Sequence, residues 1–132
     1  MNGAAESSRG GCHCGRVAFE VAGRPARVVE CNCSICAKKA YLHWIVPKED
    51  FQLLTPAENL AIYTFSTGVA RHYFCPVCGV APFYIPRSDP DKIDVNVRCL
   101  EGIDLDQLAI DRFDGRTWES AIAGWRATPE RD

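Results

Sequence analysis

Three cysteines fall within six residues of this sequence, in the stretch CNCSIC that runs from Cys31 through Cys33 to Cys36. Cysteine thiolates are preferred ligands of zinc, and a closed structural zinc site has four protein ligands. A zinc ion held by only three keeps one exchangeable position, as catalytic zinc sites do. Because a thiolate-rich zinc favours sulfur as its next ligand, the stretch predicts a catalytic zinc that accepts a small thiol.

Four further cysteines form two close pairs, Cys12 with Cys14 and Cys75 with Cys78. Side chains alternate along extended backbone, so both thiols of a Cys-x-Cys pair lie on one face. A Cys-x-x-Cys-Gly turn brings two sulfurs to one ion, and its glycine, here Gly79, accepts the backbone conformation of the turn. The pairs together predict a four-thiolate structural zinc. The alternative is that the first pair consists of free surface thiols or forms a redox pair with the second.

The eighth cysteine, Cys99, stands apart from these motifs. It either closes the three-cysteine site as a fourth ligand or is buried as a small apolar side chain, which is the commoner fate of a lone cysteine. His13 and His43 are set aside, because an isolated histidine is more often packed than a ligand. Several cations could meet the carboxylates of a bound thiol, and none is singled out: Lys38, Lys39, Arg71, His72, Arg87 and Arg98.

The composition is that of a globular protein. Of its 132 residues, 47% are hydrophobic and 24% charged, and the formal net charge is -2. A chain without a basic excess lacks the footprint of phosphate-backbone binding, which argues against a nucleic-acid partner. The sequence has neither the apolar run of roughly 18 residues of a membrane helix nor the apolar region of a signal peptide. We therefore expect a cytoplasmic protein without a membrane partner, whose thiols stay reduced for metal binding.

Period-2 alternation with β-branched and aromatic residues predicts a mainly β protein. Glycine- and proline-containing turns separate the strands, as in an antiparallel, hairpin-rich fold. One short helical turn is expected at residues 104–108 and another over 117–125. Residues 1–10 are expected to be disordered and residues 11–132 to form a single domain. Strands are predicted at residues 16–21, 27–30, 41–46, 60–65, 69–74, 81–85 and 93–98. The aromatic residues are interpreted as core and sheet-face packing: Trp44, Phe51, Tyr63, Phe65, Phe74, Phe83, Tyr84, Phe113 and Trp118.

The motifs resemble those of the glutathione-dependent formaldehyde-activating enzymes and of the related centromere protein V domain. The similarity runs over nearly the whole chain, from about Gly11 to Trp125. It lies in the stretches GCHCG from Gly11, CNCSIC from Cys31, FCPVCG from Phe74 and FYIPRS from Phe83. The shorter stretches IVP and YTF, from Ile45 and Tyr63, resemble the centromere protein V branch, and NVRCL, from Asn96, resembles bacterial members.

The resemblance implies a β-tent fold of short antiparallel strands organised around two zinc ions per chain, with one or two short helices. The resemblance does not include Cys99 among the zinc ligands. It implies a carbon–sulfur lyase of the S-(hydroxymethyl)glutathione synthase type, which promotes reversible adduct formation between glutathione, or a similar thiol, and formaldehyde or a small aldehyde. The implied structural zinc ligands are Cys12, Cys14, Cys75 and Cys78, and the implied catalytic zinc ligands are Cys31, Cys33 and Cys36.

Two other functions compete with this one. The first is a zinc-stabilised protein-binding module without turnover, resembling centromere protein V, in which both metals are structural. The second is a redox dithiol protein, which ranks last because no βαβ pattern precedes a Cys-x-x-Cys pair. An exchangeable ligand at the second zinc would favour the enzyme, and a fourth protein ligand there would favour the module.

Overall fold

The computed structural model of the chain describes residues 6–117, 119–120 and 122–123. Short strands dominate it, joined by turns and by short 3-10 segments. The strands are β1 (Ser7–Gly11), β2 (Ala18–Ala22), β3 (Arg27–Cys31), β4 (Leu42–Pro47), β5 (Phe51–Leu53), β6 (Ala61–Tyr63), β7 (Arg71–Phe74), β8 (Phe83–Ile85), β9 (Lys92–Asn96) and β10 (Ala109–Phe113). Helix α1 is Ser34–Lys39, and the 3-10 segments are η2 (Lys48–Asp50), η3 (Ala57–Asn59), η4 (Val97–Cys99), η5 (Leu105–Gln107) and η6 (Gly115–Thr117).

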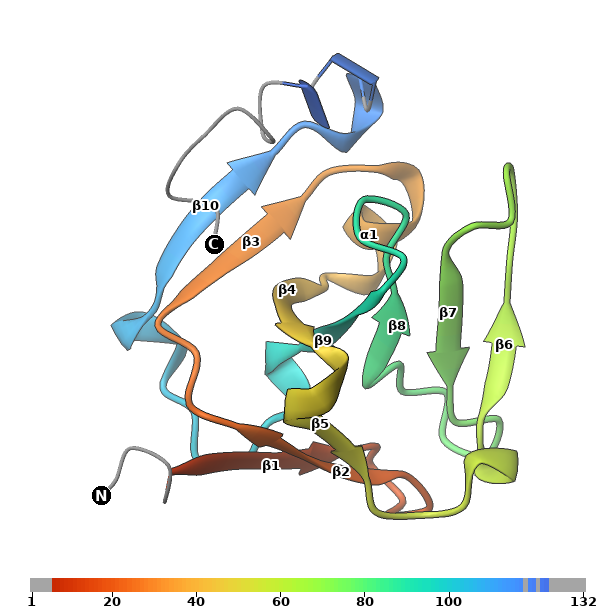
Figure 1. Cartoon of the computed structure of the whole chain (residues 1–132), viewed down its shortest axis with the longest axis vertical. Coiled ribbons are helices and arrows are strands. Elements are labelled where there is room, and N and C mark those ends of the chain that lie inside the picture. Colours follow the sequence, from red (N-terminus) through yellow and green to blue (C-terminus); the bar gives the residue numbers. More distant parts are fainter. Residues whose placement is uncertain (1–5, 118, 121, 124–132) are drawn as a thin grey trace.

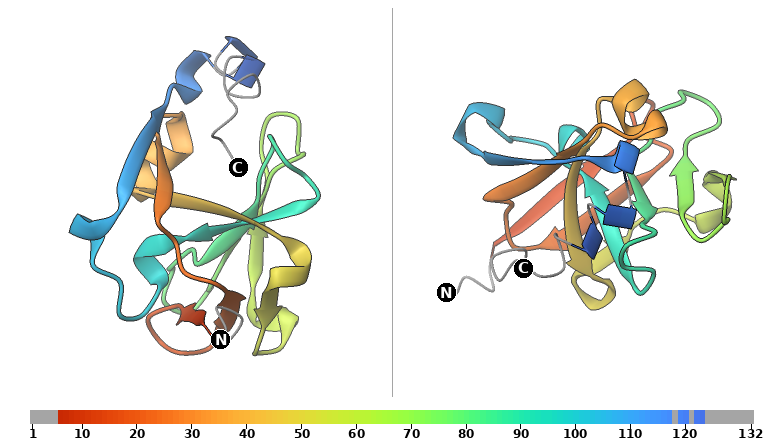
Figure 2. Two further views of the ribbon diagram at one scale, coloured as in Figure 1. Left: turned by 60° about the vertical axis from the view of Figure 1, so that its left-hand side comes forward. Right: turned by 90° about the horizontal axis from the view of Figure 1, so that it is seen from above.

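The strands form two sheets (Figure 1). The smaller has the order β1-β2-β5, and the larger has the order β10-β3-β4-β9-β8-β7-β6. Their pairings are antiparallel except that β10 lies parallel to β3 at one edge of the larger sheet. Two further views show the large sheet curving, with β10 and β3 on one side and β6 and β7 on the other (Figure 2). The predicted mainly β fold is confirmed.

One face of the large sheet packs on the small sheet and forms the hydrophobic core. Phe83 and Val95 are in register across β8 and β9, and both belong to this core. Phe19 of β2 is fully buried, with its ring stacked on Phe51 at 5.2 Å and edge-on to Phe83 at 6.1 Å. Burying each such side chain contributes about 1.5–3 kcal/mol. This contact between the sheets fixes the orientation of the large sheet.

The opposite face of the large sheet carries a different set of side chains, because successive residues of a strand point to opposite faces. Ile45, Asp94 and Tyr84 are in register across β4, β9 and β8, and His72 of β7 is in register with Tyr84. Three of these four residues are polar or titratable, although Asp94 and His72 are both buried. A buried face with these groups is the floor on which the candidate site is built.

The expected disorder of residues 1–10 is wrong for the residues after Glu6. Ser7 to Gly11 form β1, which pairs with β2, and the buried Ser8 donates a hydrogen bond to the Gly23 carbonyl at 2.8 Å. Small polar residues gave no apolar pattern, so the pairing with β2 was not visible in the sequence. Residues 1–5 lie outside the described residues.

The other predicted strands are confirmed within a few residues, but three strands, the α-helix and several 3-10 segments were missed. The helical turn expected at residues 104–108 is η5, capped by the Asp104 side chain. The turn expected over 117–125 is helical at residues 119–120 and 122–123, while residues 118, 121, 124 and 125 lie outside the described ranges. Strands β1, β5 and β10 and helix α1 were not predicted. In the described part of the chain, no helix has the length and apolar character that crossing a membrane requires.

Candidate functional site

Four cysteines come together at the end of the small sheet. Cys12 and Cys14 lie in the bend between β1 and β2, and Cys75 and Cys78 lie in the turn after β7. The four sulfur atoms lie within 4.8 Å of one another, with the Cys14 sulfur 3.7 Å from that of Cys12 and 3.6 Å from that of Cys75. The expectation that the first pair lies in extended backbone is therefore wrong. A bend that contains Gly15 at φ 88° turns both thiols toward the second pair.

The turn at Cys75 has the backbone of a metal-binding knuckle. Gly79 adopts the predicted left-handed conformation, φ 81°, and its N–H donates to the Cys75 carbonyl at 2.8 Å. The N–H of Cys78 donates to the Cys75 sulfur at 3.5 Å. The pKa of Cys78 is lowered to about 6 by hydrogen bonds from backbone N–H groups. The largest contribution comes from the N–H of Val80 and the next from that of Cys14. These donors favour thiolates, which is the protonation state that binds a cation.

Three cysteines form the second group, at the junction of β3 and α1. Cys31 ends β3, Cys33 is the N-cap of α1, and Cys36 lies buried in the first turn of the helix. The Cys33 sulfur accepts a hydrogen bond from the Cys36 N–H at 3.4 Å, and all three sulfurs lie within 4.8 Å of one another. The helix thus folds the CNCSIC stretch so that its thiols converge.

The three thiols of this group cannot all ionise on their own. Hydrogen bonds from Cys31 first and Cys36 next lower the pKa of the Cys33 thiol, and the same contacts raise the pKa values of the other two thiols. The contacts among the three sulfur atoms thus favour the ionised form of Cys33 and the protonated forms of Cys31 and Cys36. A divalent cation would replace the shared protons and allow three thiolates, so the donor set fits a soft metal such as zinc.

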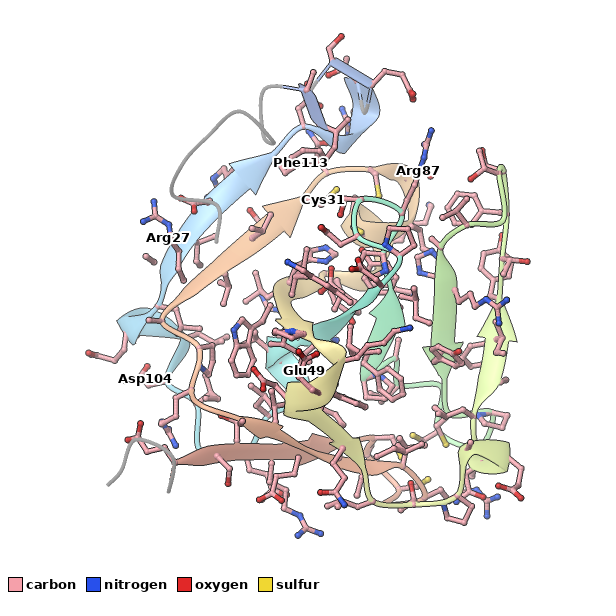
Figure 3. All side chains as sticks on the ribbon, in the orientation of Figure 1. Arg27, Cys31, Glu49, Arg87, Asp104 and Phe113 are labelled. Carbon is pink, nitrogen blue, oxygen red and sulfur yellow. The ribbon has the colours of Figure 1, made fainter. Side chains whose placement is uncertain are left out.

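The three-cysteine group, but not the four-cysteine group, lines a cavity of about 410 Å³. The cavity opens on the polar face of the large sheet, between α1, the loop after β6 and the segment after β10. One wall is a row of stacked rings, with Phe65 5.5 Å from His72 and His72 4.7 Å from Tyr84. Another side of the cavity is lined by Cys31 and Phe113, which lie next to each other at the ends of the paired strands β3 and β10 (Figure 3).

A buried polar cluster forms the floor of the same cavity. The His43 Nδ1 atom lies 2.8 Å from Asp94 Oδ2, and the Tyr41 hydroxyl donates to the Asp94 carbonyl at 2.8 Å. His43 was expected to be a packed or partly exposed side chain, and it is buried, but the sequence did not reveal that His43 and Asp94 both line the cavity. The signal for Asp94 was a charged residue in the middle of the apolar strand around Ile93 and Val95.

Two arginines and a histidine border the cavity, and two of these three residues were among the candidate cations. His72 and Arg87 line it, together with Arg116, which sequence reasoning missed. Arg87 also pairs with Glu119 at 3.1 Å. The other candidate cations are not part of the lining: Lys38, Lys39, Arg71 and Arg98.

Cys99 belongs to neither sulfur group. It is half-buried, with its sulfur 3.9 Å from the Ala81 carbonyl. Burial is the main reason why its pKa is raised to about 11. The alternative in which Cys99 closes the three-cysteine site is therefore not supported. Of the aromatic residues expected in the core, Tyr63 and Phe65 are exposed instead, and Trp118 lies outside the described residues.

Gly115 packs directly against the three-cysteine group. A Cβ atom added there would lie 2.5 Å from the Cys31 sulfur and 2.6 Å from the Cys33 Cβ atom. We expect Gly115→Ala to displace these sulfurs and to weaken the binding of a metal ion at this group about tenfold, as disturbing the support of metal ligands usually does. Competition with a chelator measures the loss. The four-cysteine group is the internal control, and equal retention of both ions in the variant would contradict the packing argument.

Comparison with known proteins agrees with this arrangement. The family model described as glutathione-dependent formaldehyde-activating enzyme matches residues 7–112. A crystal structure of a Rhodobacter sphaeroides protein, a structural genomics target, is 32% identical and superposes with a TM-score of 0.69. That similarity covers 78% of this chain and 99% of the other. The matched residues span the four-cysteine group and Cys31, Cys33 and Cys36. The chain belongs to the glutathione-dependent formaldehyde-activating enzyme family.

Proposed function

We propose that the protein is a zinc-dependent enzyme of the carbon–sulfur lyase type that promotes reversible addition of glutathione to formaldehyde or another small aldehyde. One observation carries this proposal. Cys31, Cys33 and Cys36 line the 410 Å³ cavity and the four-cysteine group does not, so a small molecule held in this cavity would meet a metal bound by the three sulfurs. An S-(hydroxymethyl)glutathione synthase needs this combination, because its thiol substrate must approach a site that can hold it ionised.

The proposal assigns one zinc ion to each cysteine group. Cys12, Cys14, Cys75 and Cys78 would hold a closed structural ion, and Cys31, Cys33 and Cys36 would hold the catalytic one. When bound at the second group, zinc supplies Lewis acidity that favours the ionised form of an incoming thiol near neutral pH. A cytoplasmic setting is part of the proposal, because its reductants would keep all of these thiols free for metal.

The residues of the chain would bind and orient the substrates. Arg87 and Arg116 border the cavity, where their guanidinium groups can pair with the carboxylates of glutathione. The buried rings of His72 and Tyr84, stacked on one another, would limit the access of water to the place where the new carbon–sulfur bond forms. Holding thiol and aldehyde side by side removes part of the entropic barrier to addition.

A protein-binding module is the second candidate, and one observation favours it. Large apolar side chains are exposed on β6 and in the loop that follows it: Ile62, Tyr63, Phe65 and Val69. Exposed apolar patches mark interaction sites more often than chance. This candidate requires no thiol in the cavity, so ligand binding separates it from the enzyme.

Glutathione should bind at the cavity through its sulfur, and S-methylglutathione should bind at least about tenfold more weakly, because a thioether cannot become a thiolate ligand. The two compounds carry the same charges, so the comparison isolates the sulfur. Titration calorimetry of the zinc-loaded protein measures both affinities. Equal affinities would mean that only the charges are recognised, and failure of both compounds to bind would favour the protein-binding module.

A further inference from the structure

The imidazole of His43 has one nitrogen without a partner. The side chain is 5% exposed, and its Nδ1 atom is held 2.8 Å from Asp94 Oδ2, but Nε2 has no hydrogen-bond partner among the described residues. A buried polar atom left unpaired costs about 1–3 kcal/mol. Packing alone does not repay this cost, so the unpaired nitrogen points to a ligand that completes it.

The surroundings fix both the position and the tautomer of this ring. His43 on β4 and Asp94 on the neighbouring β9 face the same side of the sheet, and the Tyr41 and Tyr84 rings lie 4.6 Å and 5.8 Å from the imidazole. The pKa values of both tyrosines are raised, mainly by burial and to a smaller extent by the Asp94 carboxylate. Both tyrosines therefore stay protonated. The Asp94 carboxylate can only accept a hydrogen bond, so Nδ1 carries the proton that it donates, and in the neutral ring Nε2 presents a lone pair.

His43 and Asp94 line the cavity that Cys31, Cys33 and Cys36 also line. We propose that His43 is the proton carrier of the addition reaction, with Asp94 as the positioning residue that orients it. This inference rests on the proposed function and deepens it. It names the residue that would take the thiol proton and deliver it to the aldehyde oxygen, whereas the cysteines would only hold the metal that binds the sulfur.

The proposed step balances without any further reactant. The Nε2 lone pair takes the thiol proton of glutathione, and the sulfur attacks the aldehyde carbon to form the carbon–sulfur bond. The π-electron pair of the carbonyl moves to oxygen, and the Nε2 proton is delivered there to give the hydroxyl of the adduct. His43 is then neutral again. In the reverse direction the same nitrogen removes the hydroxyl proton, and the carbon–sulfur bond breaks.

His72, the other histidine in the cavity, is less suited to this task. The pKa of His72 is lowered to about 4, mainly by burial and to a smaller extent by the nearby Lys39. Its ring is also stacked between Phe65 and Tyr84. At neutral pH it is therefore a weaker proton acceptor than an ordinary imidazole.

Two substitutions test the assignment, with adduct formation followed by exchange spectroscopy. His43→Gln should lower the catalysed rate about 100-fold, the usual contribution of a general acid–base group. Glutathione affinity, measured by calorimetry, should stay within about twofold, because the sulfur and carboxylate contacts remain. Asp94→Asn should also lower the rate, since an amide N–H can donate to Nδ1 and reverse the tautomer. A folded His43→Gln protein with the wild-type rate would overturn the proposal.

A measurement on the unmodified protein decides the matter if the variants do not fold. The chain has three histidines, so nitrogen-15 labelling of this residue type gives an assignable spectrum. His43 should carry its proton on Nδ1 in the zinc-loaded protein, and its Nε2 signal should shift when glutathione and formaldehyde are added. The exposed His13 should not respond. A proton on Nε2 in the free protein, or an unresponsive Nε2 signal, would refute the assignment.

The two proposals fail in different ways. Wild-type protein that does not accelerate adduct formation would end the proposed function, and with it this inference. Wild-type protein that accelerates the reaction, with a folded His43→Gln variant equally fast, would end only the role of His43.

Discussion

Replacing Cys31, Cys33 and Cys36 together by serine should return glutathione–formaldehyde adduct formation to its uncatalysed rate, a loss of about 100-fold or more. Serine keeps the shape of the side chain but is a poor ligand for soft metals, so the cavity loses the group that holds the thiol. Exchange spectroscopy of the two substrates measures the rate. Elemental analysis should show the zinc content falling from two ions per chain to one.

The control for this variant is Cys99→Ser. Cys99 is a cysteine outside both sulfur groups, so its substitution tests the general effect of losing a thiol. It should leave the rate and both zinc ions near their wild-type values. A triple variant that retains catalysis would show that the three cysteines are not the reactive site, and one that loses both zinc ions would show that the two groups are not independent.

Cys78→Ser should destabilise the whole domain by about 5 kcal/mol, a large part of the stability of a small protein. The four-cysteine group joins residues far apart in the sequence, such as Cys14 and Cys75, which are 61 positions apart. A zinc ion held there, as proposed, would close a long loop, and its binding free energy would contribute directly to folding. Thermal unfolding of the zinc-loaded proteins measures the loss.

Val77→Ser is the matched control for that variant. Val77 lies in the same turn and is 65% exposed, so its side chain contributes little to the core. The control should unfold at nearly the wild-type temperature. If Cys78→Ser did so as well, the four-cysteine group would have no structural role.

The cysteine motifs could be grouped from sequence because their spacing is local information. The turn at Cys75, Val77 and Gly79 encodes its own geometry, and CNCSIC places three thiols within reach of one ion whatever the rest of the fold does. The strands around Phe83 and Val95 were likewise predictable, since alternation reports burial directly. Spacing also suggested that the first two cysteines join the later pair, and the family resemblance implied the same grouping.

The rest depended on contacts that no local pattern records. His43 and Asp94 meet because β4 pairs with β9, and neither residue signals the other in the sequence. Gly115 and Arg116 reach the cavity because β10 lies beside β3, an edge pairing without an apolar signature. Helix α1 is only six residues long, too short for helical periodicity to appear. Each of these features is set by tertiary structure.

The parallel pairing of β10 with β3 has a consequence for the order in which the molecule is built. Its side-chain contacts include Arg27 with Asp111, 84 positions apart, so this edge is a contact of very high sequence separation. Such contacts form late, because a long stretch of chain must lose its freedom first. On the ribosome, the CNCSIC thiols emerge long before the segment that covers them is synthesised. The nascent chain therefore passes through a period in which these three sulfurs are exposed to oxidants and to competing metals.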